Sequence, residues 1–122
     1  MSTNEDLDLS FLYEIADGSD EFIVESVGMF LQQTPELIDS IESAIAQSDW
    51  PTAAAAAHKL KPNLGFFGML NSESLLQEIE SMSKAGGQDP DAIRTKFTQA
   101  KQMLGQNLVA LEKIKQEKET GL

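Results

Sequence analysis

Apolar residues recur at spacings of three and four along most of the chain, and no long segment alternates apolar and polar residues. Such spacing places apolar side chains on one face of an α-helix, whereas strict alternation is typical of a strand. The pattern therefore predicts an all-helical protein. Breaks in the apolar series divide the chain into one short helix followed by four longer ones.

A glycine separates the first two expected helices. Residues 8–18 predict a short helix that ends at Gly18 in a left-handed conformation, and Ser19 is suited to cap the next helix. The apolar stripe of this second helix continues past Pro35 to about residue 47. We expect one helix bent near Thr34, because proline removes a backbone hydrogen bond; two helices meeting at the proline are the alternative. The inward residues are expected to be Leu9, Leu12, Ile15 and Ala16, followed by Ile23, Val27, Phe30, Leu37 or Ile38, Ile41 and Ile45.

The other three helices begin with recognisable capping residues. Asp49, with Pro51 in the first turn, predicts the start of a helix over 50–68. Asn71 or Ser72 is expected to cap the fourth helix, which ends at the glycine pair 86–87, and Asp89 with Pro90 starts the last. The expected inner stripes of these last two helices are Leu75, Leu76, Ile79 and Met82, and Ile93, Phe97, Ala100, Leu104, Leu108, Leu111 and Ile114.

Four amphipathic helices joined by short turns hide their apolar stripes by packing antiparallel. The expected architecture is therefore an up-down-up-down four-helix bundle, with the short N-terminal helix covering one end. At 122 residues the chain is expected to form a single domain over 1–122, with loose ends at about 1–6 and 119–122.

Composition removes several classes of function. The chain has no cysteine and one histidine, which excludes disulfides, thiolate metal sites and sites that need two imidazoles. Its net charge of −11 argues against nucleic acid or anionic lipid as the main partner. No apolar run is long enough to span a membrane and no signal peptide is evident, so a cytoplasmic location is the expectation.

The histidine, His58, stands where positive charge first appears. Residues 1–57 contain twelve Asp and Glu but no Lys or Arg, and Lys59 and Lys61 then follow beside the imidazole. At 100° per residue, His58 points away from a core face formed by Ala53, Leu60, Leu64 and Phe67. Its neighbours on the outer face are expected to be Ala54, Ala55, Lys61, Pro62, Gly65 and, about three turns on, Met69.

This outer face has unusually low relief for a helix surface. Proline and glycine inside a helix cost about 3 and about 1 kcal/mol relative to alanine, so Pro62 and Gly65 indicate that close approach to the imidazole is favoured. The simpler alternative is a solvated histidine whose two lysines balance nearby carboxylates, with Phe66 as half-buried cover.

The segment "AHKLKPNLGFFG" resembles the signature of histidine-containing phosphotransfer (HPt) domains. In that family a phosphorylatable histidine is followed by leucine, lysine, a small residue, and an aromatic residue before glycine. Pro62 is a departure, because the family more often has glycine there. The matching positions are His58, Leu60, Lys61, Gly65, Phe67 and Gly68, and "DW" at 49–50 is similar to the family's lead into this helix.

The resemblance implies a four-helix bundle that acts as a phosphorelay intermediate. His58 would accept a phosphoryl group on Nε2 from the aspartate of a receiver domain and pass it to a second receiver, as a phosphocarrier rather than an ATP-dependent kinase. Expected partners are receiver domains of hybrid sensor kinases and response regulators. No cofactor is expected on this chain, which we expect to be monomeric, and Mg²⁺ would be bound by the receiver.

The negative charge of a phosphoryl group indicates roles for the residues around the histidine. Lys61 would stabilise the phosphoryl oxygens, and Lys59 would add a weaker positive potential. A surface of Ala54, Ala55, Pro62, Gly65, Phe66 and Met69 would contact the partner. An HPt-like bundle that binds receivers without being phosphorylated is the alternative. A carboxylate-bridged metal enzyme is disfavoured, because it needs paired Glu-x-x-His motifs.

Overall fold

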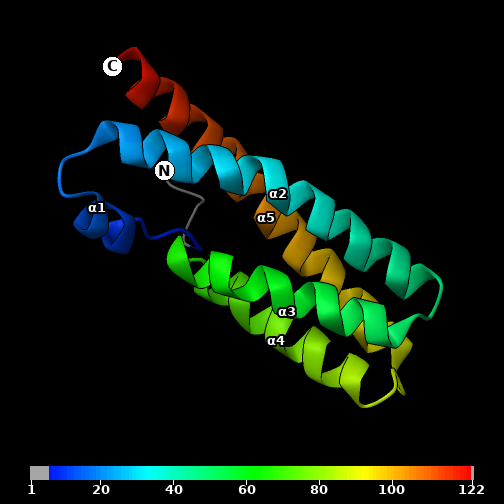
Figure 1. Cartoon of the computed structure of the whole chain (residues 1–122). Helices are drawn as coiled ribbons and strands as arrows, with labels where there is room; N and C mark the ends of the chain where they lie inside the picture. The colour runs from blue at the N-terminus through cyan, green and yellow to red at the C-terminus, as the bar shows by residue number, and fades with distance from the viewer. Residues whose placement is uncertain (1–5, 122) are drawn as a thin grey trace.

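The computed structural model describes residues 6–121, and every regular element in that range is an α-helix (Figure 1). This confirms the all-helical prediction. The five helices are α1 (Ser10–Ala16), α2 (Asp20–Ala46), α3 (Trp50–Phe66), α4 (Leu70–Lys84) and α5 (Pro90–Thr120).

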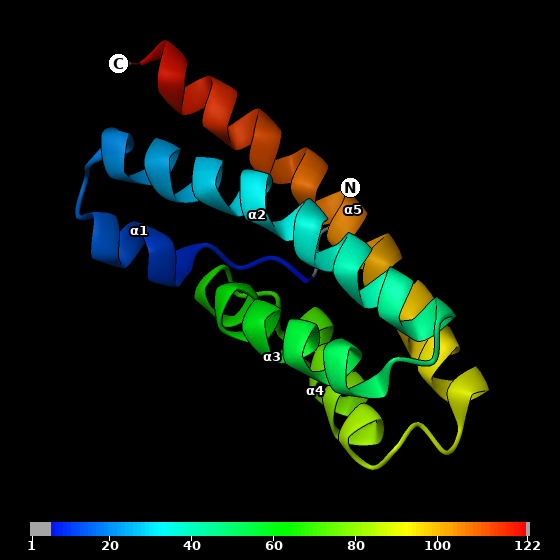
Figure 2. The same ribbon diagram turned by 45° about the vertical axis from the view of Figure 1, so that its right-hand side comes forward.

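Helices α2 to α5 form the expected antiparallel bundle. α3 packs against α2 and α4, and α5 packs against the same two helices, so the four close into a ring around one core. The long helices α2 and α5 have 27 and 31 residues, against 17 and 15 for α3 and α4. At a rise of about 1.5 Å per residue, α2 and α5 extend well beyond the other pair. The short α1 lies against α2 at that extended end (Figure 2).

The apolar stripes meet inside the ring, and most of the expected core residues are buried. Ile38 rather than Leu37 takes the inward position, and Ile15 is 46% exposed, contrary to expectation. α1 has only seven residues, and the face that carries Leu12 and Ala16 packs on the bundle, so Ile15 projects away from it. The expected residues that are only half-buried are Leu9, Leu37, Leu75, Met82, Leu108 and Ile114.

α2 is a single helix that passes through Pro35, so the alternative of two helices is wrong. The hydroxyl of Ser19 caps it by accepting from the Phe22 N–H at 3.1 Å, as expected. Before this cap, Asp17 takes the left-handed position at the end of α1, with φ of 49°, where Gly18 was expected. Gly18 is itself left-handed, with φ of 87°.

An N-terminal segment crosses the end of the bundle and caps α4. The Asp6 carboxylate is buried and accepts from the backbone N–H groups of Asn71 and Ser72, at 2.6 and 3.1 Å. The expectation that Asn71 or Ser72 caps α4 is therefore wrong, because Met69 holds that position without a side-chain bond and Asp6 supplies the oxygen.

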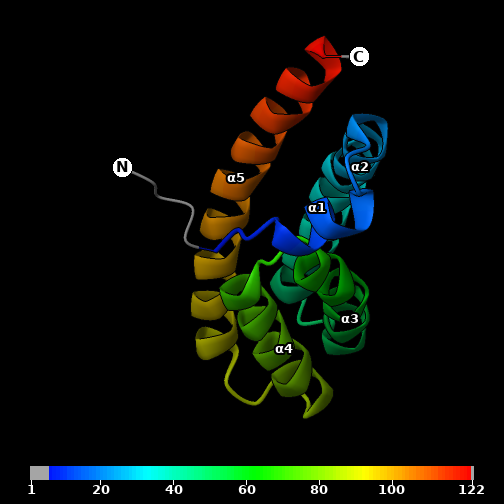
Figure 3. The same ribbon diagram turned by 90° about the vertical axis from the view of Figure 1, so that its left-hand side faces the viewer.

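The described range reaches into both of the segments that were expected to be loose. Asp6 lies within the segment expected to be loose, and α5 remains helical to Thr120 although a loose end was expected from about residue 119. Figure 3 shows the N-terminal segment passing in front of α5 on its way to α1. Residues 1–5 and 122, on which the rest of that expectation falls, lie outside the described part.

Two glycines allow close approaches that fix this arrangement. Gly68, in the α3–α4 connection, has φ of 68°, and a Cβ there would lie 2.1 Å from the carbonyl oxygen of Asp8. Gly87 has φ of 66°, and its Cβ would lie 2.1 Å from the Trp50 indole. Both positions need glycine for conformation and for space.

Candidate functional site

α3 presents His58 to solvent on the side opposite the core. The helix starts as expected, with the Asp49 carboxylate accepting from the Thr52 N–H at 3.3 Å and Pro51 in the first turn. Ala53, Leu60 and Leu64 are fully buried, and Phe67 is 3% exposed. The His58 side chain is 68% exposed, which agrees with the orientation derived from the helical spacing.

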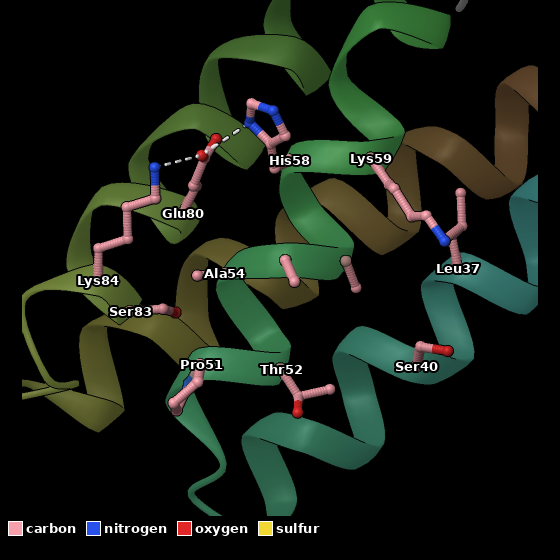
Figure 4. Close-up of a pocket in the computed structure, with 12 residues that line it drawn as sticks. Leu37, Ser40, Pro51, Thr52, Ala54, His58, Lys59, Glu80, Ser83 and Lys84 are labelled. Atoms are coloured by element: carbon pink, nitrogen blue, oxygen red, sulfur yellow. Dashed lines mark hydrogen bonds and ion pairs between the residues drawn. The ribbon is translucent and has the colours of Figure 1, made fainter.

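The imidazole is held by a carboxylate from the neighbouring helix. His58 Nδ1 lies 2.9 Å from Oε2 of Glu80 on α4, whose side chain is only 4% exposed. A carboxylate accepts hydrogen bonds, so this contact favours the tautomer with the proton on Nδ1. The other ring nitrogen, Nε2, lies on the side of the ring away from Glu80 and keeps its lone pair (Figure 4).

Two lysines pair with the same carboxylate. The Lys61 ammonium lies 2.7 Å from Glu80 Oε1, and the Lys84 ammonium lies 3.0 Å from Oε2. These contacts lower the pKa of Glu80 from 4.5 to about 2, with the hydrogen bond from Lys61 as the largest cause, against the opposing effect of burial. Glu80 is therefore ionised throughout the neutral range, and its negative charge is always available to the imidazole.

The two lysines beside His58 occupy different surroundings. Lys61 is 18% exposed and reaches across to α4, where it also donates to the amide oxygen of Gln77. Its ammonium is thus engaged with Glu80 instead of standing open to an incoming anion. Lys59 is exposed, points toward Leu37 on α2, and has no ion pair within the described residues (Figure 4).

The residues expected to contact a partner differ in how far they reach the surface. Ala55 and Pro62 are exposed, whereas Ala54 is 5% exposed. Gly65 is half-buried beside Glu73 of α4, and a Cβ there would lie 3.1 Å from its carboxylate. Phe66 is half-buried and stacks edge-on against Phe11 of α1, with the ring centroids 5.5 Å apart.

Met69 does not belong to this surface, contrary to expectation. Its side chain is fully buried in the core. The helical spacing placed Met69 beside His58 only on the assumption that the helix continues through residue 68. α3 ends at Phe66 instead, and the left-handed Gly68 reverses the chain so that Met69 turns inward.

A groove of about 780 Å³ runs along α3 from its first turn to His58. Small side chains of α3 line its floor, and α2 and α4 supply its two walls (Figure 4). Most of its exposed lining is apolar, with the charged groups gathered at the histidine end. The lining residues are Leu37, Ser40, Pro51, Thr52, Ala54, Ala55, Ala56, His58, Lys59, Glu80, Ser83 and Lys84.

Glu80 and Lys84 are the site residues that the sequence expectations missed. Glu80 directly follows Ile79 of the inner stripe, at a position where a helix turns from core to surface. A carboxylate so close to the core needs partners. Lys84 lies four residues later, at the spacing of a helical ion pair. The position of Glu80 beside the stripe and its spacing from Lys84 were the available signals.

Within residues 6–121, no helix combines the length and apolar character that crossing a membrane requires. The same described residues contain no group of three or more His, Asp or Glu side chains placed to hold a metal ion.

Comparison with known proteins agrees with the helical bundle. A family model described as the Hpt domain matches residues 25–113, which include the whole of α3 and α4. The comparison with curated proteins gave no match.

A solved structure supports the same fold. The crystal structure of the HPt domain from a hybrid sensor histidine kinase of Shewanella is similar to this chain, with a TM-score of 0.77 and 22% identity. The alignment covers 92% of this chain and 95% of that one. By the family match over most of its length, this chain belongs to the Hpt domain family, the phosphotransfer domains of two-component signalling.

Proposed function

We propose that this chain is a phosphorelay intermediate that carries a phosphoryl group on Nε2 of His58. The observation that carries the proposal is the exposed imidazole whose Nδ1 is bound by Glu80 at 2.9 Å. That contact leaves Nε2 unprotonated and directed toward solvent, which is what an attacking nitrogen requires.

The proposed donor is the aspartyl phosphate of a receiver domain. The Nε2 lone pair forms a bond to phosphorus while the bond from phosphorus to the aspartate oxygen breaks, and that electron pair returns to the carboxylate. Transfer to a second receiver follows the same path in reverse. Because the transferring group has little covalent bonding in its transition state, the chain contributes mainly position and charge.

The neighbouring side chains suit this role. The small residues Ala54 and Ala55 let a partner surface come close to the imidazole, and the groove beside them gives an apolar contact area. Lys59 is the cation best placed to move toward an incoming anion, because it has no ion pair among the described residues. Lys61 acts first on Glu80, and its contact with the phosphoryl oxygens stays a prediction.

The test uses receiver domains of the source organism, phosphorylated with acetyl phosphate and Mg²⁺ and mixed with this chain. We expect an acid-labile, base-stable label on the chain and none on His58→Gln, with both proteins equally helical by circular dichroism. Binding of phosphorylated receivers without any label would instead identify a receiver-binding module. ATP alone is expected to label nothing, because the expected donor is an aspartyl phosphate.

A further inference from the structure

Glu80 contacts Nδ1 of His58, which is not the nitrogen that attacks phosphorus in the proposed transfer. Phosphorylation of Nε2 leaves Nδ1 in place, so its 2.9 Å contact with Glu80 Oε2 stays available in the phosphorylated protein. The inference that follows rests on the proposed function, since it concerns the phosphorylated form of His58.

The ring of a phosphohistidine exists in two forms of different reactivity. When Nε2 of a neutral imidazole bonds to phosphorus and Nδ1 keeps its proton, the ring is a phosphoimidazolium cation. Loss of the Nδ1 proton to water gives the neutral form. Cleavage of the N–P bond releases neutral imidazole from the cation but imidazolate, a much stronger base and poorer leaving group, from the neutral form. Protonated phosphohistidine is therefore the reactive carrier.

The charged groups around the phosphorylated ring determine whether it keeps or loses the Nδ1 proton. On α4, the Glu80 carboxylate contacts the ring directly, and Lys84 lies behind it at 3.0 Å. On α3, Lys61 lies against the other oxygen of the same carboxylate, at 2.7 Å, and Lys59 points toward α2. The α2 residues that line the groove beside His58 are Leu37 and Ser40, neither of which is charged.

The Glu80 carboxylate affects the Nδ1 proton more strongly than the two lysines do. A hydrogen bond to a charged group stabilises the charged form of the donor, and among residues 6–121 the ring has this bond only with Glu80. Lys61 and Lys84 approach the carboxylate oxygens, so they weaken its charge but do not replace its contact with the ring. Their pairing also keeps the carboxylate ionised and in place.

We propose that Glu80 keeps a proton on Nδ1 after Nε2 has been phosphorylated, so that this chain carries its phosphoryl group as the reactive phosphoimidazolium. One proton then stays on Nδ1 through the whole cycle. In onward transfer the N–P bond breaks, its electron pair returns to Nε2, and the ring is again neutral with the same Nδ1 proton. Neither step requires proton exchange with solvent, which suits a carrier that passes the group on instead of storing it.

The direct test needs no mutation and no partner. Chain labelled with ¹⁵N in histidine is phosphorylated with potassium phosphoramidate, and the Nδ1 chemical shift is followed between pH 5 and 10 by NMR. A phosphorylated peptide of residues 54–62 is the reference without Glu80. We expect Nδ1 in the protein to lose its proton about one pH unit or more above the peptide, from the strength of a charge-assisted hydrogen bond. Coincident titrations would overturn the proposal.

A second measurement follows hydrolysis of the phosphorylated protein against pH. The hydrolysis rate falls as the pH rises, because the ring loses its Nδ1 proton. In Glu80→Gln this fall is expected at lower pH, so that at pH 8 hydrolysis is about tenfold slower than in the unchanged chain. Lys84→Met is the matched control, because it removes one ion pair of Glu80 but keeps the carboxylate. Its profile is expected to stay in place or move to higher pH, and a shift to lower pH as in the glutamine variant would contradict the proposal.

These results are separable from the proposed function. Phosphoramidate labels the histidine whether or not any receiver does so, and the NMR titration therefore does not depend on transfer from a receiver. If receivers fail to label His58 while Nδ1 still holds its proton, the relay role fails and the electrostatic inference stands. If receivers label His58 but the protein and peptide titrate together, the relay role stands and the inference about Glu80 fails.

Discussion

Replacing Lys61 with methionine and Glu80 with glutamine, singly and together, measures the strength of the ion pair that fixes the carboxylate beside His58. The pair joins Lys61 Nζ and Glu80 Oε1 at 2.7 Å, and the two side chains are 18% and 4% exposed. The same protein offers an exposed reference pair, Lys101 and Glu42, at 3.0 Å with side chains 49% and 51% exposed.

The magnitude follows from burial and from the pKa of Glu80. Lowering that pKa from 4.5 to about 2 means that folding favours the carboxylate by up to about 3 kcal/mol, since each tenfold change is worth about 1.4 kcal/mol. Lys61 is the largest cause and shares the effect with Lys84 and His58. We therefore expect a coupling free energy of about 2 kcal/mol for the buried pair. For the exposed pair about 0.5 kcal/mol or less is expected.

The assay is urea unfolding at pH 7, followed by circular dichroism, on the four proteins of each double-mutant cycle. Lys61→Met alone is expected to be the costlier single change, because it leaves a buried carboxylate with fewer partners. Equal coupling in the two cycles would refute the reasoning, because the position of Glu80 between the helices would then give its ion pair no added strength.

Three further changes test other parts of the structure. Because the pKa of Glu80 is lowered to about 2 in the folded chain, ionised Glu80 contributes fully to stability above about pH 4.5, and this contribution is lost as the pH falls toward 2. The free energy of unfolding, measured over a pH series, should therefore fall more steeply in acid for the unchanged chain than for Glu80→Gln. Asp6→Ala should cost about 2 to 3 kcal/mol, because it leaves the α4 N–H groups unpaired. Asp8→Ala, which removes only the hydrogen bonds from Ser10 at the start of α1, should cost about 1 kcal/mol. Equal costs in urea unfolding would argue against Asp6 as the cap of α4. Gly68→Ala should destabilise the protein by about 3 kcal/mol, as measured by thermal unfolding. In the same measurement Gly105→Ala, where an added methyl group meets no other atom, should stabilise the protein slightly. A Gly68→Ala variant of unchanged stability would contradict the close approach to Asp8.

Features set by neighbours along the chain were predictable from the sequence. The caps at Ser19, Asp49 and Asp89 each accept from an N–H three residues later, so residue type and spacing were sufficient. The same holds for the outward direction of His58, because it lies within an uninterrupted part of α3 whose apolar residues define the core face. The helix caps and the direction of His58 follow from regular helix geometry, which residue type and spacing are sufficient to predict.

Met69 shows where such reasoning fails. A helical wheel remains valid only while the helix lasts, and α3 ends three residues before Met69. Gly68 signalled a break in the helix. Its left-handed φ of 68° reverses the direction in which the following side chain points. The direction of Met69 therefore depended on a backbone dihedral angle that residue spacing does not specify.

Contacts between distant segments were beyond the sequence pattern. Glu80 is 22 residues from His58, and Asp6 is 65 residues from Asn71, in the respective hydrogen bonds. Asp6 has no local signature that separates it from the many solvated carboxylates of this acidic chain. Glu80 stands out by its place beside Ile79 and its spacing from Lys84, but neither signal identifies His58 as its partner. Only the packing of α3 on α4, and the path of the N-terminal segment over the bundle end, bring them to their partners.

The most direct test of the central claim is to identify the atom that receives the phosphoryl group. After transfer from a phosphorylated receiver domain to ¹⁵N-histidine-labelled chain, ³¹P and ¹⁵N NMR distinguish the two ring nitrogens of His58. The geometry predicts a phosphorus bond to Nε2, with Nδ1 still bound to Glu80. Phosphorus on Nδ1, or a chain that stays unmodified beside every phosphorylated receiver of its source organism, would contradict the account.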